Sequence, residues 1–105
     1  MNIEMRNVKL RGFLNDCCDI LESKGRDYNP DGVAFSEIRA EAKDLGLKPE
    51  QVLLVLAGKH WGAIKTYVRT GQLASEPVRE RLKDLANYCA LMAVLLEDNQ
   101  NEESR

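Results

Sequence analysis

Residues 78–96 read VRERLKDLANYCALMAVLL, and this stretch decides the fold. Apolar side chains recur along it at alternating steps of four and three residues, which places them on one side of an α-helix over five turns. An apolar stripe of this kind is stable in water only when another element covers it. The segment therefore predicts a long amphipathic helix packed on other helices, with a stripe formed by Val78, Leu82, Leu85, Cys89, Met92 and Leu96.

Three earlier segments show the same helical periodicity. We expect helices over residues 7–23, 34–45 and 49–70. Gly46 and Gly71 follow the second and third of these segments, in the position where a left-handed glycine commonly ends a helix.

The link between the first and second helices is predicted to be a loop over residues 24–32. It contains Gly25, the pair Asn29-Pro30 and Gly32. Proline disfavours helical geometry at the residue before it, and glycine favours turns, so the composition argues against a continuous helix here.

Four helices with short links and almost no strand signal predict an all-α protein with a four-helix bundle-like domain. Residues 1–97 are assigned to this single domain, and the polar residues 98–105 to a frayed tail. The chain has 105 residues, 44% of them hydrophobic, which suffices for one modest core. The last helix carries a second apolar stripe, Tyr88, Leu91 and Leu95, so we expect a homo-oligomer, a dimer or higher, to bury it.

Charge and hydropathy exclude several classes of protein. The formal net charge of −2 supplies no basic field for gripping duplex DNA. The longest apolar stretches fall far short of the roughly 20 residues that span a bilayer, and residues 1–16 lack the apolar centre of a secretory signal. The three cysteines, two of them adjacent, do not form a disulfide framework. We therefore expect a cytoplasmic protein with reduced thiols that binds neither membrane nor duplex DNA.

A first polar cluster lies at the end of the first predicted helix. Lys24 and Arg26 are cations that suit a phosphate, Gly25 permits a tight turn, and the Tyr28 ring can stack on a base beside Asp27. The alternative is a simple helix end, with glycine as the cap and cations favoured by the helix dipole. That alternative leaves Asp27 and Tyr28 unexplained.

A second cluster, Lys59 and His60, lies on the apolar stripes of the third helix. A buried ammonium needs an anion, either a protein carboxylate or a ligand phosphate, unless Lys59 extends along the helix into water. His60 is either a hydrogen-bonded core imidazole or a ligand contact. Because it is the only histidine, a histidine-rich zinc site within one chain is excluded.

A third cluster, on the last helix, consists of Glu80, Asp84 and Asn87, which share one strip of the helix, with Tyr88 beside them. Oxygen ligands in this arrangement suit Mg²⁺, which usually keeps waters and shares a substrate phosphate. Glu37 and Glu41, one turn apart on the second helix, are further candidate ligands. The alternative for all these acids is an ordinary solvated surface.

The order of these motifs resembles a known family. Lys-Gly-x-Asp-Tyr at residues 24–28, the lysine at 59 and Asp-Leu-x-Asn-Tyr at residues 84–88 are similar to motifs of small phage and prophage proteins of the nucleotide-modification-associated family. That family is similar to the MazG-like all-α NTP pyrophosphatases. The resemblance covers about residues 20–96. It implies a helical oligomer in which two acidic pairs hold Mg²⁺ and a nucleoside triphosphate is hydrolysed to the monophosphate and pyrophosphate.

Under this resemblance, Asp84 matches the closing aspartate of the second acidic pair, and Glu37 with Glu41 occupies the place of the first. The spacing of Glu37 and Glu41 is one residue longer than in the family pattern. Arg81 stands where the other acid of the second pair belongs, and Glu80 lies one residue earlier. These differences bear more on catalysis than on binding.

Three hypotheses follow: an Mg²⁺-dependent nucleoside triphosphate pyrophosphohydrolase, a phage accessory module that binds a nucleotide without turnover, and a structural helical oligomer whose polar clusters are internal salt bridges. Under the first, the catalytic residues are Asp84, Glu80 and Lys59, and the metal ligands are Glu37, Glu41, Glu80 and Asp84. The expected ligand-binding residues are Lys24, Arg26, Asp27, Tyr28, Lys59, His60, Asn87 and Tyr88.

Overall fold

A computed structural model describes the backbone of residues 1–103 and the side chains of residues 1–101. Its elements are four helices: α1 (Ile3–Tyr28), α2 (Ser36–Leu45), α3 (Pro49–Thr70) and α4 (Val78–Glu103). Residues 1–103 contain no strand. The prediction of an all-α, four-helix bundle-like fold is confirmed.

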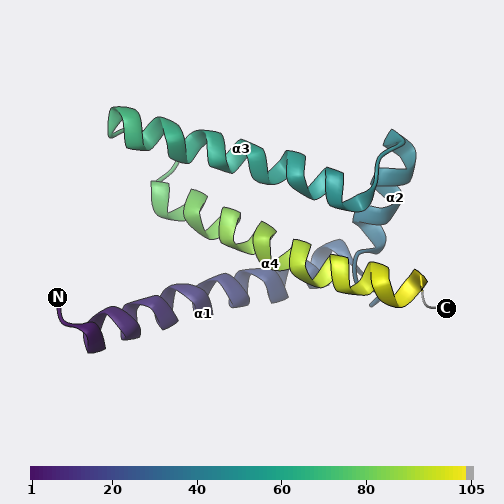
Figure 1. Ribbon diagram of the computed structural model, residues 1–105, viewed down its shortest axis with the longest axis horizontal. Helices are drawn as coiled ribbons and strands as arrows, with labels where there is room; N and C mark the ends of the chain where they lie inside the picture. The colour runs from purple at the N-terminus through teal and green to yellow at the C-terminus, as the bar shows by residue number, and fades with distance from the viewer. Residues whose placement is uncertain (104–105) are drawn as a thin grey trace.

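The helices are arranged around α4. α3 and α4 form an antiparallel pair, and α4 lies between α3 and α1 (Figure 1). α2 lies at the end where α3 begins. The side chain of Arg79, in the first turn of α4, stacks on the Phe13 ring of α1 and lies 3.6 Å from Asp16. α1 is therefore held to α4 from its middle onward, and its first turns project past the start of α4 (Figure 1).

The predicted ends of α2 and α3 are confirmed. Gly46 and Gly71 adopt left-handed conformations with φ of 70° and 77°, as expected where these helices stop. Pro49 begins α3, where its missing N–H removes no helical hydrogen bond.

The predicted loop over residues 24–32 is wrong in its first half, because α1 continues to Tyr28. A single glycine inside a helix costs only about 1 kcal/mol relative to alanine, so Gly25 weakens α1 without ending it. The helix ends at Asn29, whose backbone N–H donates to the Gly25 carbonyl at 3.0 Å. As the pattern indicated, the residue before Pro30 leaves helical geometry.

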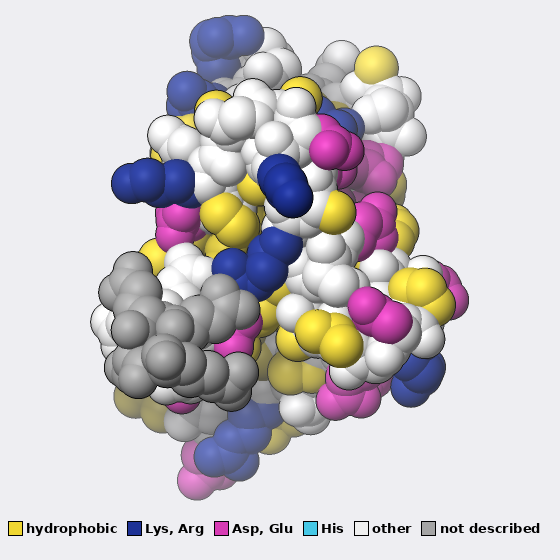
Figure 2. Space-filling view, turned by 90° about the vertical axis from the view of Figure 1, so that its right-hand side faces the viewer, with side chains coloured by type: hydrophobic (Ala, Val, Ile, Leu, Met, Phe, Trp, Pro, Cys, Tyr) yellow, Lys and Arg dark blue, Asp and Glu magenta, His cyan; other side chains and the backbone are white. Residues whose placement is uncertain are grey.

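The frayed tail predicted from residue 98 is also wrong for the described residues, because α4 continues to Glu103. Arg39 of α2 donates to Asp98 at 2.8 Å and to Asn99 at 2.9 Å, and Asn99 donates to Glu50 of α3 at 2.7 Å. We call these three hydrogen bonds among Arg39, Asp98, Asn99 and Glu50 the clamp. They give the polar residues at the end of α4 partners that the composition alone did not show. Residues 104–105 of the predicted tail lie outside the described residues. At this end of the molecule, basic and acidic side chains alternate over the surface (Figure 2).

α4 is rotated relative to the sequence prediction. Leu95 is fully buried, whereas Leu82 and Leu96 of the regular stripe are 41% and 44% exposed, and Cys89 is exposed. The second stripe, which we expected an oligomer to cover, therefore faces the interior of the chain. Six apolar side chains form the buried core: Cys17, Ala42, Val52, Leu53, Ile64 and Leu95.

All three cysteines are free, and Cys17 is buried. Burial raises the pKa of the Cys17 thiol above its ordinary value, which keeps it protonated and unreactive. Throughout residues 1–103, no helix combines the length and the apolar character needed to cross a membrane.

Truncation of Leu95 tests the rotation of α4. Because Leu95 is fully buried, Leu95→Ala should lower the free energy of unfolding by about 2–5 kcal/mol in urea titrations followed by circular dichroism. Val68→Ala, at a side chain that is 80% exposed, should change it by less than about 0.5 kcal/mol. If the two variants were equally stable, the inner face of α4 would be assigned wrongly.

Candidate functional site

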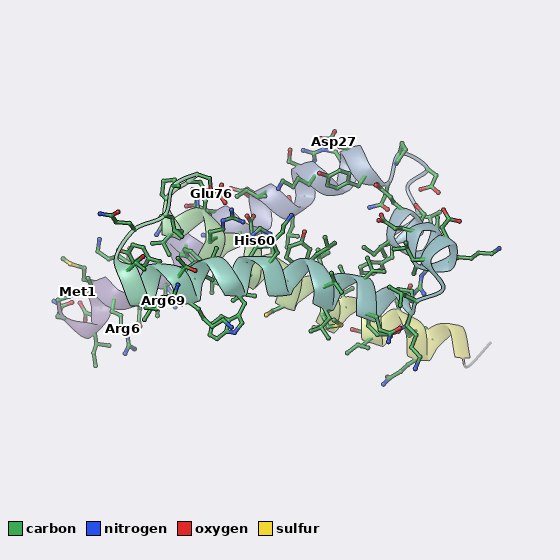
Figure 3. All side chains as sticks on the ribbon, turned by 90° about the horizontal axis from the view of Figure 1, so that it is seen from above. Met1, Arg6, Asp27, His60, Arg69 and Glu76 are labelled. Atoms are coloured by element: carbon green, nitrogen blue, oxygen red, sulfur yellow. The ribbon has the colours of Figure 1, made fainter. Side chains whose placement is uncertain are left out.

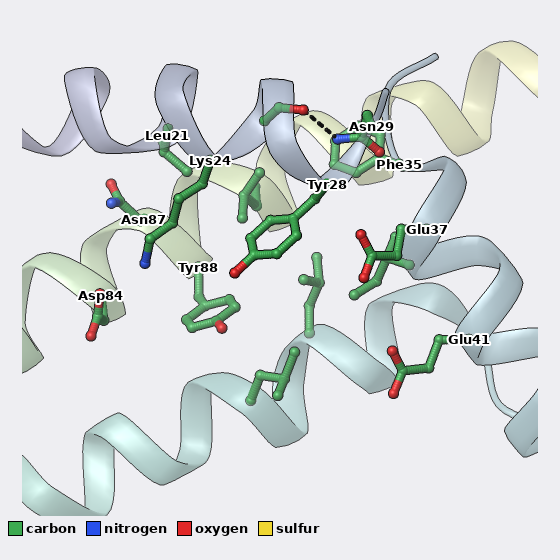
Figure 4. Close-up of a pocket in the computed structure, with 15 residues that line it drawn as sticks. Leu21, Lys24, Tyr28, Asn29, Phe35, Glu37, Glu41, Asp84, Asn87 and Tyr88 are labelled. Atoms are coloured by element: carbon green, nitrogen blue, oxygen red, sulfur yellow. Dashed lines mark hydrogen bonds between the residues drawn. The ribbon is translucent and has the colours of Figure 1, made fainter. Parts of the chain in front are cut away.

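A pocket of about 370 Å³ lies where the four helices face one another (Figure 4). Its volume falls within the range of roughly 300–1,000 Å³ that is usual for small-molecule sites. Seven of the predicted site residues line it: Lys24, Tyr28, Glu37, Glu41, Asp84, Asn87 and Tyr88. They come from α1, α2 and α4, while α3 supplies apolar side chains to the wall.

α1 contributes Lys24 and Tyr28. Because this segment is helical, the two residues lie one turn apart on the same face, and both side chains reach into the pocket (Figure 4). Arg26 and Asp27 belong to other faces of α1 and do not line the pocket. Asp27 lies at the outer edge of the molecule (Figure 3). The predicted loop grouped all four residues in one site, whereas the helix directs Lys24 and Tyr28 into the pocket and Arg26 and Asp27 away from it.

α2 contributes Glu37 and Glu41, whose carboxylates extend toward the pocket from successive turns (Figure 4). Among the described side chains, no three His, Cys, Asp or Glu residues are placed to hold a metal ion. The acids of α2 are thus not gathered with Asp84 into a closed cage. Two carboxylates at one wall still fit Mg²⁺, which commonly takes one or two protein ligands and completes its shell with waters and phosphate oxygens.

α4 contributes Asn87, the most unusual polar residue of the site. The residue is 7% exposed and its amide makes no hydrogen bond within residues 1–101, although the amide atoms themselves are not fully enclosed. It lies beside Lys24 at one end of the pocket (Figure 4). An amide at a pocket wall that keeps some accessible surface can bond to water or to a ligand.

His60 lies behind the pocket and supports its α4 wall. The ring is buried, stacks on Tyr88 with centroids 5.5 Å apart, and its Nδ1 lies 3.5 Å from Oδ2 of Asp84. Arg81 Nη1 donates to the same Nδ1 at 3.1 Å, which requires a neutral imidazole with its proton on Nε2. His60 is therefore mainly a core imidazole that packs against Tyr88 and accepts from Arg81.

Arg81 points toward α3 and away from the pocket. Its Nε lies 2.8 Å from Oε1 of Glu76, in addition to the contact with His60. His60 and Glu76 both lie on this side of α3 and its following loop (Figure 3). The cation that stands in place of an expected acid is thus neutralised by a local carboxylate and does not line the pocket.

Two of the predicted catalytic residues, Lys59 and Glu80, lie outside the pocket lining. Lys59 is exposed on α3, which agrees with the alternative that its side chain extends into water. Glu80 accepts from Lys83 at 3.3 Å, one turn further along α4. Of the predicted catalytic set, only Asp84 lines the pocket.

The two tyrosines give the pocket an aromatic centre. Burial, the negative charge of Asp84 and the neighbouring Tyr28 together raise the pKa of Tyr88 above its ordinary value. Its phenol stays protonated at neutral pH and can donate a hydrogen bond. Because folding favours the neutral phenol, the free energy of unfolding decreases as the pH rises above 10.

The apolar lining was not predicted as part of a site. These side chains carry no chemical signal and follow the same helical stripes as ordinary core residues, so only their placement in space reveals them. They are Leu21, Phe35, Ile38, Leu53, Leu56 and Leu91. Asn29, which ends α1, also lines the pocket and was interpreted only as a turn residue.

Comparisons with protein-family models, curated proteins and solved structures find no match to this chain.

The unpaired amide of Asn87 yields a prediction. Asn87→Leu replaces a largely buried amide that makes no hydrogen bond within the fold with an apolar group of similar size, so the free energy of unfolding should stay unchanged or rise. His60→Leu removes the acceptor of Arg81 and should lower it by roughly 1–3 kcal/mol. Both are measured by urea titration. A loss in Asn87→Leu as large as in His60→Leu would show that Asn87 serves the fold.

Proposed function

We propose that the pocket binds a nucleotide together with Mg²⁺, in keeping with the phage family that the motifs resemble and with a cytoplasmic protein. The observation that carries the proposal is the convergence of unpaired polar groups from three helices on one pocket of about 370 Å³. Among them, the amide of Asn87 makes no hydrogen bond within residues 1–101. A bound ligand would supply its hydrogen bonds.

The competing hypothesis treats the polar clusters as internal salt bridges, and it predicts partners for each charge. Glu80 with Lys83, and Arg81 with Glu76, meet that expectation. By contrast, the side chains of Lys24, Glu37 and Glu41 have no ion-pair partner within residues 1–101. Three of the four charged side chains that line the pocket therefore remain open to a ligand.

The chemistry of the lining assigns a role to each wall. Lys24 is the cation nearest the unpaired amide and suits a phosphate oxygen (Figure 4). Tyr28 and Tyr88 offer ring faces on which a base can stack, an interaction worth about 1–3 kcal/mol. Three carboxylates and one lysine line the pocket, so an anionic phosphate is favoured only with a divalent cation to offset the acids.

The two lysines singled out by the sequence provide a matched test. Calorimetric titration with nucleoside triphosphates and Mg²⁺ should show binding that Lys24→Met weakens at least about tenfold, because a charge-assisted contact to phosphate is lost. Lys59→Met, which removes an exposed lysine outside the pocket, should bind as the native protein does. Failure of every nucleotide to bind, or equal weakening in both variants, would refute the proposal.

A second candidate function is hydrolysis of the bound triphosphate to the monophosphate and pyrophosphate. It is favoured by one specific observation, the presence of Glu37, Glu41 and Asp84 on the same pocket. Glu37 and Glu41 would hold the ion, and Asp84 would face it from α4. When bound, Mg²⁺ supplies neutralisation of phosphate charge and an activated water. Lys59, outside the lining, has no part in this arrangement.

Turnover is tested by Mg²⁺-dependent release of pyrophosphate. Glu41→Gln should reduce the rate at least about tenfold, because it removes one of the two carboxylates at the α2 wall. Glu80→Gln, at an acid paired with Lys83, should leave the rate unchanged. If neither the native protein nor any variant released pyrophosphate, hydrolysis would be excluded and nucleotide binding would remain as the function.

A further inference from the structure

The middle of α4 has the composition of a helix that is covered on all sides. Residues 85–96 contain no charged side chain, although 30% of the whole chain is charged. A helix that is apolar all round is normally buried. α1 and α3 pack on α4 from two sides, and Leu91 and Leu95 point toward the interior that these helices share.

The other side of the same segment is an apolar surface that nothing in the chain covers. We call it the outer face of α4. Its members recur at steps of four and three residues, and four of the five are exposed: Leu82, Ala86, Cys89, Ala93 and Leu96, with Ala86 partly covered. None of them lines the pocket, so the outer face is independent of the proposed function.

The chain as a whole exposes more surface than a monomer of its size. Its accessible surface is 7866 Å², whereas about 6,000 Å² is typical for 11.9 kDa, an excess of roughly 1,900 Å². Its radius of gyration is 16.0 Å against about 13 Å for a compact domain of this length. Stable homodimers bury about 1,000–2,500 Å² on each subunit, which is the amount that this chain has in excess.

We propose that a second copy of this chain packs on the outer face of α4, with the two α4 helices antiparallel about a two-fold axis. An interface of this kind is isologous, since each copy presents the same surface to the other. The small side chains of Ala86 and Ala93 let the helix backbones approach closely. Leu82 of one copy then lies toward the partner's Leu96, so large side chains fill both ends.

The charges at the two ends of the outer face select the antiparallel arrangement. Arg79 precedes the face and stays 57% exposed beside Phe13 and Asp16 of its own chain, and the exposed Glu97 follows the face. An antiparallel pair brings Arg79 toward the partner's Glu97 at both ends, whereas a parallel pair sets like charges beside each other. Complementary charge at the rim of an interface favours the correct register over the wrong one.

Cys89 lies near the middle of the outer face and therefore near the proposed axis. The sequence pattern predicted a buried thiol there, and in the single chain it is exposed. A second copy resolves this difference by covering it. The two Cys89 thiols would then face each other across the axis, within reach of a short cross-linker.

The oligomeric state is the first test. Sedimentation equilibrium of the native protein should give twice 11.9 kDa, and Ala93→Glu, which places a charge on the outer face, should give 11.9 kDa with unchanged helicity by circular dichroism. The control is Val55→Glu, at an apolar position on α3 that is likewise exposed, and this variant should remain dimeric. A monomeric native protein, or equal behaviour of the two variants, would overturn the proposal.

Cross-linking is the second test and holds even if Ala93→Glu fails to fold. Cys18 is exposed on α1, so the reaction is carried out on Cys18→Ser, with the buried Cys17 retained. A short bismaleimide should convert this protein to a covalent dimer, and the further change Cys89→Ser should abolish the product. A dimer that gives no cross-link through Cys89 would place the interface on another surface.

Discussion

The orientation of α4 about its own axis is the constraint on which the rest of the structure depends. The helix turns its less regular face inward, so that Asp84, Asn87 and Tyr88 meet α1 and α3. His60 supports this orientation by stacking on Tyr88 and by accepting from Arg81 of the same helix. As a result, Leu82, Cys89 and Leu96 of the regular apolar stripe are left exposed at the surface. The pocket and the uncovered outer face are thus two results of one rotation.

The sequence was sufficient for the helices but not for the faces they present. Pro49, Gly46 and Gly71 act through local backbone chemistry, so the last residue of α2 and both ends of α3 could be predicted to the residue, whereas α2 begins two residues later than predicted. The extension of α1 through Gly25 could not, because a penalty of about 1 kcal/mol is offset by contacts that only the folded chain contains. The continuation of α4 depends in the same way on Arg39, a partner distant in sequence.

The candidate site shows the same division. Spacing on a single helix predicted that Glu37 and Glu41 act together, and a helical α1 brings Lys24 and Tyr28 together for the same reason. Whether Lys59 also lines the pocket depends on which side of α3 faces inward. Lys59 and His60 are adjacent in sequence, so their side chains point about 100° apart around the helix and only one of them can face the interior. His60 therefore takes the interior and Lys59 the solvent. Polar residues on an apolar stripe signalled a site, but not which of them belong to it.

The clamp at the far end of the molecule has a consequence for the acidic wall of the pocket. Arg39 lies between Glu37 and Glu41 in the sequence of the short helix α2. Its guanidinium forms an ion pair with Asp98 of α4 at 2.8 Å. The position of α2 against α4 thus depends on a partly exposed ion pair. Dissolved electrolyte screens such pairs far more than it affects buried leucines. High ionic strength should therefore loosen the carboxylate wall well before the helical core melts.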